Sequence, residues 1–246
     1  MCEEIPIMGI GSSVPTNRKS RGNWANQGRR ISNDASSTTL INCTFNANFA
    51  SHGGGIANLP TNSSPRVSNC ILWGDTPDEI FVLSKPPVVT YSDVQGGWSG
   101  NGNNNIAVDP CFADTSSPDA NEWDYHLQSQ NGRWDPNQNK WVTDATTSQC
   151  IDKGKPTSNW TRELWPHGKC INMGAYGGTP QASMSLSGAG NVADLNNNDL
   201  VDYADLQMLA NKWLSQEFLL SEDLDRNGVV NFTDFAIFAN NWLWEE

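Results

Sequence analysis

A duplicated segment near the end of the sequence constrains this chain more than any other feature. The twelve residues DLNNNDLVDYAD at 194–205 return as DLDRNGVVNFTD at 223–234, an offset of twenty-nine. The stretches that overlap and follow them, YADLQMLANKWL and FTDFAIFANNWL, match at the same offset. A pattern kept in register over about fifty residues predicts two equivalent units that fold against each other.

Oxygen-bearing side chains stand at the first, third, fifth, ninth and twelfth places of both copies. A calcium ion takes about six to eight oxygen ligands, and a twelve-residue loop supplies them from these places and from the seventh carbonyl. Each copy has three carboxylates there, enough to neutralise a divalent ion, so we expect about two Ca²⁺ ions per chain. The expected ligands are Asp194, Asn196, Asn198, the Leu200 carbonyl, Asp202 and Asp205 in the first loop, and Asp223, Asp225, Asn227, the Val229 carbonyl, Asn231 and Asp234 in the second.

The sixth place distinguishes the two loops. Gly228 occupies it in the second loop, where the chain must turn sharply, but Asp199 occupies it in the first. A left-handed backbone costs free energy for a residue with a side chain, although Asp bears it better than most. We therefore expect the first site to be the weaker one. A calcium-free alternative for either loop is an Asx-rich turn that caps a helix, which two loops in register disfavour.

A helix is expected after each loop, because apolar residues recur there at helical spacing. In the first copy these are Leu206, Leu209, Ala210, Trp213 and Leu214. Two short helices that pack their apolar stripes together, each begun by a calcium loop, would form a small all-α domain completed by the metal.

With Asp instead of Glu at the twelfth place, the two units resemble the type I dockerin family. Members of that family bind cohesin domains of a scaffold and so fasten secreted enzymes to a complex or a surface. The resemblance implies a cohesin-like partner, contacted through the tenth and eleventh loop positions and through the helices. Tyr203 and Phe232 replace the small hydroxylic residues that many dockerins carry at the tenth position. The matching partner-binding residues are Tyr203, Ala204, Asn211, Lys212, Phe232, Thr233, Asn240 and Asn241.

A second set of repeats lies upstream. GRRISN at 28–33 returns as GGGIAN at 53–58, twenty-five residues later. TLINCTF at 39–45 returns twenty-seven residues later as RVSNCIL at 66–72, and PRVSNCIL at 65–72 is followed by PVVTYSDV at 87–94 after a further twenty-two. Short strands that recur at such a period, each too short to bury a face alone, predict a solenoid of stacked coils. Parallel β coils fit this period best.

Stacked coils place equivalent residues about 4.8 Å apart. Asn42 is therefore expected beside Asn69, and Cys43 beside Cys70. We interpret both pairs as interior ladders, with hydrogen-bonded amides and small soft side chains. A redox or metal site at the two cysteines is the alternative.

The coils resemble the right-handed parallel β-helix families of the pectate-lyase-like and polymorphic outer-membrane repeat types, in which CTF-type strands alternate with GGGI-type turns. Four later segments resemble the closing coils of secreted bacterial β-helix proteins. They are AVDPCFAD at 107–114, DYHLQSQ at 124–130, SQCIDKG at 148–154 and INMGAYGG at 171–178.

The expected organisation has four parts. Residues 1–27 are interpreted as a ragged or disordered remnant, 28–182 as parallel β-helix coils with a closing cap, 183–190 as a flexible linker, and 191–246 as the dockerin-like calcium-binding domain. The expected fold class is therefore mainly β. The resemblance implies a right-handed parallel β-helix, formed by the C-terminal coils of a solenoid and followed by a small all-α domain with two calcium loops.

The charge is concentrated in the last part. The formal net charge of the chain is −12. Residues 191–246 contain eleven acidic residues and two basic ones, Lys212 and Arg226, so this part carries a net charge of −9. This acidity argues against a nucleic-acid partner, which requires a basic footprint, and no apolar run approaches the roughly 18 residues of a membrane span. The resemblances imply an extracellular or cell-surface location. The first residues lack a secretory signal, so either the beginning is missing or the protein is not exported.

The cysteines leave one question open. Six cysteines are too few and too scattered for a disulfide-rich scaffold, and none lies in a zinc-type spacing. Cys150 and Cys170 either pair in an oxidising compartment or stay buried as free thiols.

Catalysis stays equally open, and no catalytic residue is singled out. Polysaccharide lyases and O-glycosyl hydrolases on β-helices need paired carboxylates, but each acidic candidate also fits ordinary turn chemistry. The acidic candidates are Asp93, Asp109, Asp114, Asp124, Asp135 and Asp152. Six tryptophans either stack on sugars or, as we favour, cover the open end of the solenoid. They are Trp98, Trp123, Trp134, Trp141, Trp160 and Trp165.

Three functional hypotheses follow. The first is a secreted or cell-surface β-helix protein, associated with carbohydrate and attached to a cohesin-type scaffold through its calcium-dependent dockerin. The second is a polysaccharide lyase or glycoside hydrolase whose active groove lies on these coils or on missing upstream coils. In the third, the calcium module is an intramolecular cap on the solenoid.

Overall fold

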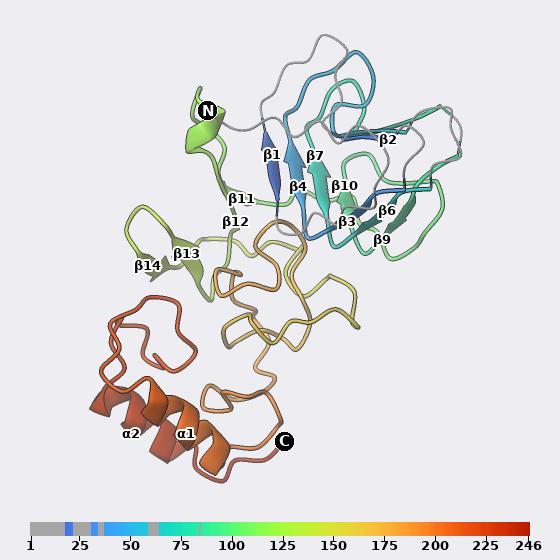
Figure 1. Ribbon diagram of the computed structural model, residues 1–246. Helices are drawn as coiled ribbons and strands as arrows, with labels where there is room; N and C mark the ends of the chain where they lie inside the picture. Colours follow the sequence, from blue (N-terminus) through green and yellow to red (C-terminus); the bar gives the residue numbers. More distant parts are fainter. Residues whose placement is uncertain (1–17, 22–30, 34–36, 59–63, 84) are drawn as a thin grey trace.

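The computed structural model describes residues 18–21, 31–33, 37–58, 64–83 and 85–246 (Figure 1). Within them the chain is mainly β, and neither of the two α-helices found there has the length and apolar character to cross a membrane. The strands are β1 (Lys19–Arg21), β2 (Ile31–Asn33), β3 (Thr39–Ile41), β4 (Thr44–Asn46), β5 (Ile56–Asn58), β6 (Arg66–Ser68), β7 (Ile71–Trp73), β8 (Ile80–Val82), β9 (Val88–Thr90), β10 (Asp93–Val94), β11 (Phe112–Asp114), β12 (Asp124–Leu127), β13 (Arg133–Asp135) and β14 (Lys140–Val142). The helices are α1 (Tyr203–Asn211) and α2 (Phe232–Asn240), besides a 3-10 turn at Ala120–Glu122.

The first ten strands form three parallel sheets, with the orders β1-β4-β7-β10, β2-β5-β8 and β3-β6-β9 (Figure 1). Consecutive strands enter different sheets, and neighbours within a sheet lie one repeat apart. Ile31 pairs with Ile56, Thr39 with Arg66, and Arg66 with Val88. These offsets are those of the sequence repeats, so the predicted pairing is confirmed.

Aligned apolar side chains hold the three sheets together. Leu40, Val67 and Val89 take equivalent places in β3, β6 and β9, and each is at most 1% exposed. Burial of each such side chain contributes about 1.5–3 kcal/mol. The core of these sheets is therefore a set of columns that run across the strands.

The two predicted side-chain pairs stack at the turns between these strands. Asn69 Nδ2 donates to Asn42 Oδ1 at 3.0 Å, and the backbone N–H of Cys43 donates to Cys70 Sγ at 3.4 Å. Both asparagines have a positive φ, near +52° and +55°, which Asn bears better than most residues. Ser92 continues the column, since its Oγ accepts from the Cys70 N–H at 3.1 Å. The expected ladders are confirmed.

The segment after β10 departs from the coils expected there. β11 pairs antiparallel with β12, and β13 pairs antiparallel with β14. Expecting 107–114 and 124–130 to be closing coils was therefore wrong. Each pair is joined by a short connection, and a parallel pair needs a crossover of about a dozen residues or more. Further on, the chain packs back on the sheets, where Asn42 Nδ2 donates to the Gly177 carbonyl at 2.6 Å.

Between this segment and the helices lies the expected linker, residues 183–190. Its first three residues, Ser183 to Ser185, are at most 6% exposed. The N–H of Met184 donates to the Gly132 carbonyl at 2.8 Å, and Ser183 Oγ donates to the Leu127 carbonyl at 2.6 Å. At the other end of the chain, β1 lies within 1–27 and pairs with β4, whereas residues 1–17 and 22–27 of that expected remnant lie outside the described residues.

The helices α1 and α2 lie side by side in the C-terminal part (Figure 1). Leu209 of α1 and Phe238 of α2 are both 1% exposed and belong to one apolar cluster. The expected stripe was wrong at two places, because Ala210 and Leu214 are exposed. At Leu214 the reason is that α1 ends at Asn211, after which the Leu214 N–H donates to the Val230 carbonyl at 2.8 Å instead of to a helical one.

Candidate metal centre

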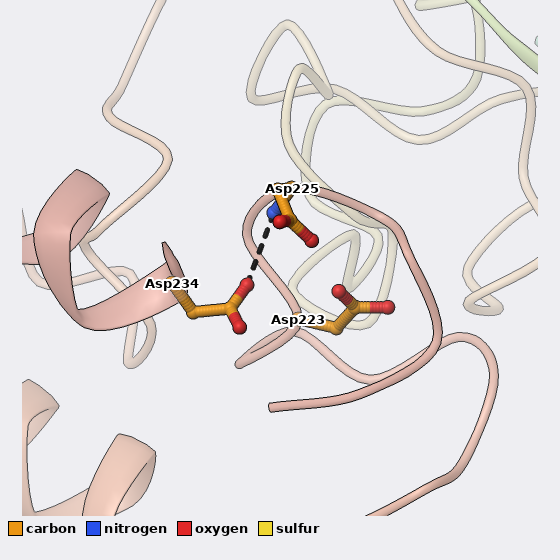
Figure 2. Close-up of side chains that lie close together, drawn as sticks. All are labelled: Asp223, Asp225 and Asp234. Carbon is orange, nitrogen blue, oxygen red and sulfur yellow. Dashed lines mark hydrogen bonds between the residues drawn. The ribbon is translucent and has the colours of Figure 1, made fainter. Parts of the chain in front are cut away.

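Three carboxylates of the second loop lie close together. Asp223, Asp225 and Asp234 each offer an oxygen within 4.8 Å of the others, and Figure 2 shows them around the turn of the chain. Asp234 is the third residue of α2, whereas the other two come from the loop before it. The first, third and twelfth places of the loop are thus brought together, as a calcium loop requires.

Backbone N–H groups fix these carboxylates. Asp223 accepts from the N–H of Asn227 at 3.1 Å and of Gly228 at 2.8 Å. Asp234 accepts from the N–H of Asp225 at 3.1 Å and of Asn231 at 2.8 Å, and the first of these bonds is drawn in Figure 2. Gly228 has a φ of 87°, the left-handed conformation expected at the sixth place. The loop is therefore closed around its acidic side chains.

The first loop has the same hydrogen-bond plan. Asp194 accepts from the N–H of Asn198 at 3.1 Å and of Asp199 at 2.9 Å. Asp205 accepts from three N–H groups, those of Leu195, Asn196 and Asp202. Asp199 has a φ of 70°, so the strained conformation predicted at this place is confirmed. The second loop has three acidic oxygens within 4.8 Å of one another. The first loop, all of whose residues the structure describes, has no such set.

The side chains at the ninth place of each loop cap the N-termini of the helices. Asp202 Oδ1 accepts from the Ala204 N–H at 2.7 Å, and Asn231 Oδ1 accepts from the Thr233 N–H at 2.8 Å. Both residues are N-caps, and each helix has a full capping box completed by the twelfth residue. A ninth residue in a calcium loop often acts through water, which is compatible with this use.

The residues present fit a cation. Burial raises the pKa of Asp223, and the nearby charge of Asp234 adds to the effect, so these carboxylates repel each other without a counter-charge. In the first loop, burial raises the pKa of Asp194 and the charge of Asp205 adds to it. Asn196 Oδ1, at the third place, is buried and has no hydrogen-bond partner among the described residues. A calcium ion would satisfy that oxygen and neutralise the carboxylates.

Each loop forms backbone hydrogen bonds with the segment that follows the helix of the other loop. The N–H of Val201 donates to the Trp244 carbonyl at 2.9 Å, and the N–H of Leu243 donates to the Val201 carbonyl at 3.0 Å. Twenty-nine residues on, Val230 makes the matching pair of bonds, accepting from Leu214 and donating to the Ser215 carbonyl at 3.1 Å. Each loop is therefore closed by the segment that follows the other helix.

Most of the expected partner-binding residues are on the surface. Tyr203 and Phe232 are both 77% exposed, with rings set edge-on against Trp242 and Trp213 at 5.1 and 5.0 Å between centroids. Ala204, Asn211, Thr233 and Asn240 are exposed as well, whereas Lys212 and Asn241 are half-buried.

Comparisons with known proteins add a family for this part of the chain. The family model of the type I dockerin domain matches residues 192–243, which hold both loops and both helices. This part is similar to a type I dockerin domain and is called the dockerin below. A dockerin implies calcium as the cofactor and a cohesin as the partner, and it supports attachment to a scaffold. A model described as disaggregatase related matches residues 72–154. Searches of curated proteins and of solved structures found no match.

Outside the dockerin, the buried and half-buried acidic candidates have side-chain partners. Asp93 accepts from Cys150 Sγ at 3.2 Å, so Cys150 is a free thiol rather than a partner of Cys170. Asp124 binds His126 Nδ1 at 2.5 Å and Arg133 at 3.3 Å, and Asp152 accepts from Ser185. The other three, Asp109, Asp114 and Asp135, accept from backbone N–H groups two residues on, as in ordinary Asx turns.

None of the six central tryptophans is exposed. The rings of two of them contact the dockerin instead of a free solenoid end: Trp134 lies 5.9 Å from Phe218 between ring centroids, and Trp141 lies under Arg226 at 5.8 Å. These contacts, and those that His167 and Lys169 make with the first loop, could not be read from the sequence. The only sequence feature that pointed to them was Asp199, which binds Lys169 and stands at a loop position where Gly is preferred.

Proposed function

We propose that this chain is a secreted or cell-surface β-helix protein, associated with carbohydrate, that binds a cohesin-type scaffold through its dockerin in a calcium-dependent manner. Residues 28–182 would form the β-helix body, with three parallel sheets as its faces, and 183–190 the connection to the dockerin at 191–246. The match to a disaggregatase related model within the body gives no substrate, so the polysaccharide is the part of this proposal that most needs a direct test.

The observation that carries the proposal is the carboxylate cluster of the second loop. Three acidic oxygens held within 4.8 Å of one another by backbone N–H groups make a preformed cation site. The equivalent plan in the first loop, with the orphaned Asn196 oxygen, supports a second ion. All twelve residues expected from the sequence are proposed as ligands, two of them through their carbonyls.

Isothermal titration of Ca²⁺ into the chelator-treated full chain tests the metal sites. We expect about two ions in the wild type and about one in Asp223→Ala, which removes a ligand of the second loop. Glu217→Gln is the matched control, since Glu217 is an exposed acidic residue of the dockerin outside both loops. Absence of calcium heat in the wild type, or an unchanged titration in Asp223→Ala, would refute the sites.

Binding to immobilised type I cohesin domains, with Ca²⁺ and with chelator, tests the partner. The exposed rings of Tyr203 and Phe232 are proposed to lie in the contact, because large aromatic side chains dominate interface energies. Tyr203→Ala and Phe232→Ala together should weaken binding at least tenfold while the calcium titration stays unchanged. Equal binding with chelator present would contradict a calcium-dependent attachment.

A polysaccharide lyase or glycoside hydrolase remains the second candidate, for one structural reason. The register of β11 and β12 places Asp114 opposite Asp124, the kind of pair that glycoside hydrolysis uses. Hydrogen bonds from Ser116 lower the pKa of Asp114. Burial alone would raise the pKa of Asp124, but the hydrogen bond and charge of His126 and the charge of Arg133 together lower it. Neither carboxyl then holds a proton at neutral pH, as a general acid must.

Incubation of the full chain with pectin and alginate, followed by assays for reducing and unsaturated sugars, decides between the two. The attachment proposal expects no release. Release that is lost in Asp124→Asn would establish the enzyme in its place.

A further inference from the structure

The dockerin does not stand apart from the body, because its first calcium loop touches the body at the fourth place. His167 Nε2 lies 3.0 Å from Asn197 Oδ1, and Asn197 Nδ2 donates to the Thr161 carbonyl at 3.4 Å. Burial lowers the pKa of His167 to about 4, so the ring is neutral. Its Nδ1 accepts from the Lys169 N–H at 3.2 Å, which leaves Nε2 as the donor to Asn197.

The sixth place of the same loop makes the second contact. Lys169 Nζ donates to Asp199 Oδ1 at 2.5 Å and also pairs with Glu246 of the dockerin. A glycine would suit the backbone at 199 better, since φ is 70° there. The ion pair with Lys169 therefore accounts for an acidic residue at a place where a calcium loop prefers Gly.

The second loop makes the third contact, again through its fourth place. Arg226 Nη2 donates to the Trp165 carbonyl at 2.7 Å, and its guanidinium lies over the ring of Trp141. Beside it, Phe218 packs against the buried ring of Trp134. The contact with the body thus combines ring packing with hydrogen bonds to both loops.

The connecting segment, residues 183–190, is hydrogen-bonded to the body as well. Ser185 donates its N–H to the Pro166 carbonyl at 2.8 Å, and Trp165 Nε1 donates to the Ala189 carbonyl at 3.2 Å. Leu186, between them, is 60% exposed. A cavity of about 350 Å³ lies between body and dockerin, and Lys212 lines it, whereas the exposed rings of Tyr203 and Phe232 are not part of its lining.

We propose that the body carries a docking surface for its own dockerin, formed by His167, Lys169 and the Trp165 carbonyl, which hold the fourth and sixth places of the calcium loops. Body and dockerin then move as one unit, with the rings of Tyr203 and Phe232 left open to a partner. Those loop places have left-handed conformations in the closed loop, which calcium binding would favour, so calcium should tighten the docking. That last step rests on the proposed calcium sites, whereas the docking itself does not.

Chymotrypsin cleavage of the full chain after Leu186 tests the docking, since cleavage requires the connection to open. The double variant Lys169→Gln/Arg226→Gln should be cut about tenfold faster than the wild type. Its small-angle scattering radius should also increase. Lys153→Gln, at an exposed lysine of the body, is the matched control and should behave as wild type. Equal cleavage rates and superimposable scattering curves for the double variant and the wild type would overturn the proposal.

Asp199→Gly separates docking from calcium binding. It removes the partner of Lys169 and relieves the backbone strain, so calcium affinity should stay equal or rise while cleavage becomes faster. Faster cleavage without calcium heat in any variant would refute the calcium sites and leave the docking standing. Unchanged cleavage with stronger calcium binding would refute the docking and leave the sites standing.

Discussion

Asp234→Asn is the sharpest single test of the dockerin, because this carboxylate has two separate roles. It is fully buried and accepts two hydrogen bonds, from the N–H groups of Asp225 and Asn231, and so completes the capping box of α2. It is also the twelfth residue of the proposed calcium loop. An amide keeps one accepting oxygen and sets an NH₂ group against the other backbone donor.

The expected magnitude follows from these contacts. Leaving one buried N–H without an acceptor costs about 1–3 kcal/mol, so the dockerin should lose about 2 kcal/mol of stability in chelator. Loss of one carboxylate from the metal site adds to this only when calcium is present. Each tenfold drop in calcium affinity adds about 1.4 kcal/mol at saturating Ca²⁺.

Urea denaturation followed by far-UV circular dichroism of the helices, in chelator and in saturating Ca²⁺, measures both parts. The difference between variant and wild type should be larger in calcium by at least about 1.4 kcal/mol. Asp205→Asn, the equivalent change in the first loop, is the comparison. If the Asp234→Asn difference is the same in both conditions, the carboxylate is a helix cap and not a ligand.

Three further changes have defined outcomes. Burial raises the pKa of Glu163 to about 8, so the folded state holds a proton that the unfolded state releases near pH 4.5. This proton should lower stability by about 1.4 kcal/mol per pH unit between these values, and Glu163→Gln should reduce the measured slope by that amount in denaturation at pH 5, 6 and 7. Gly102→Ala should lower the melting temperature of the body by about 6–12 °C in calorimetry, because its Cβ would lie 1.8 Å from the Val89 carbonyl oxygen and φ is 115°. Phe238→Ala should cost the dockerin about 3–5 kcal/mol and reduce calcium binding in titration, since this ring fills the core between the helices.

Each of these changes has an outcome that would contradict it, and Gly102→Ala also has a control variant. Gly96→Ala adds a Cβ at a φ of 77° with no atom within 4 Å, so it isolates backbone strain from the clash. Equal losses at Gly96 and Gly102 would contradict the clash, and a pH slope that is the same in Glu163→Gln as in the wild type would assign the proton to another group. A dockerin with Phe238→Ala that binds calcium as the wild type does would show that the two helices do not share one core.

The sequence predicted the local and repeated parts of this molecule well. The offsets between repeats gave the register of the parallel strands, because side chains that stack must recur at the same spacing. Asn42 and Cys43 were placed beside Asn69 and Cys70 by the same argument. The carboxylates of the second loop were brought together as expected, since a twelve-residue loop is a local structure with its own geometry.

Non-local contacts could not be predicted in this way. The bond from Asn42 to the Gly177 carbonyl spans 135 residues and joins segments that share no repeat. The antiparallel pairs after β10 follow from short connections that interrupt the period. The helix ends were also missed, because Leu214 lies at helical spacing but its N–H is taken by Val230 of the other loop.

Each calcium loop is closed by the segment that follows the other helix, and this affects how the dockerin is assembled. The backbone partners of Val201, in the first loop, are Leu243 and Trp244, more than forty residues later. On a ribosome, the first loop would therefore stay open until that late segment has emerged, even though its own ligands and helix are already made. The first site would therefore be completed last.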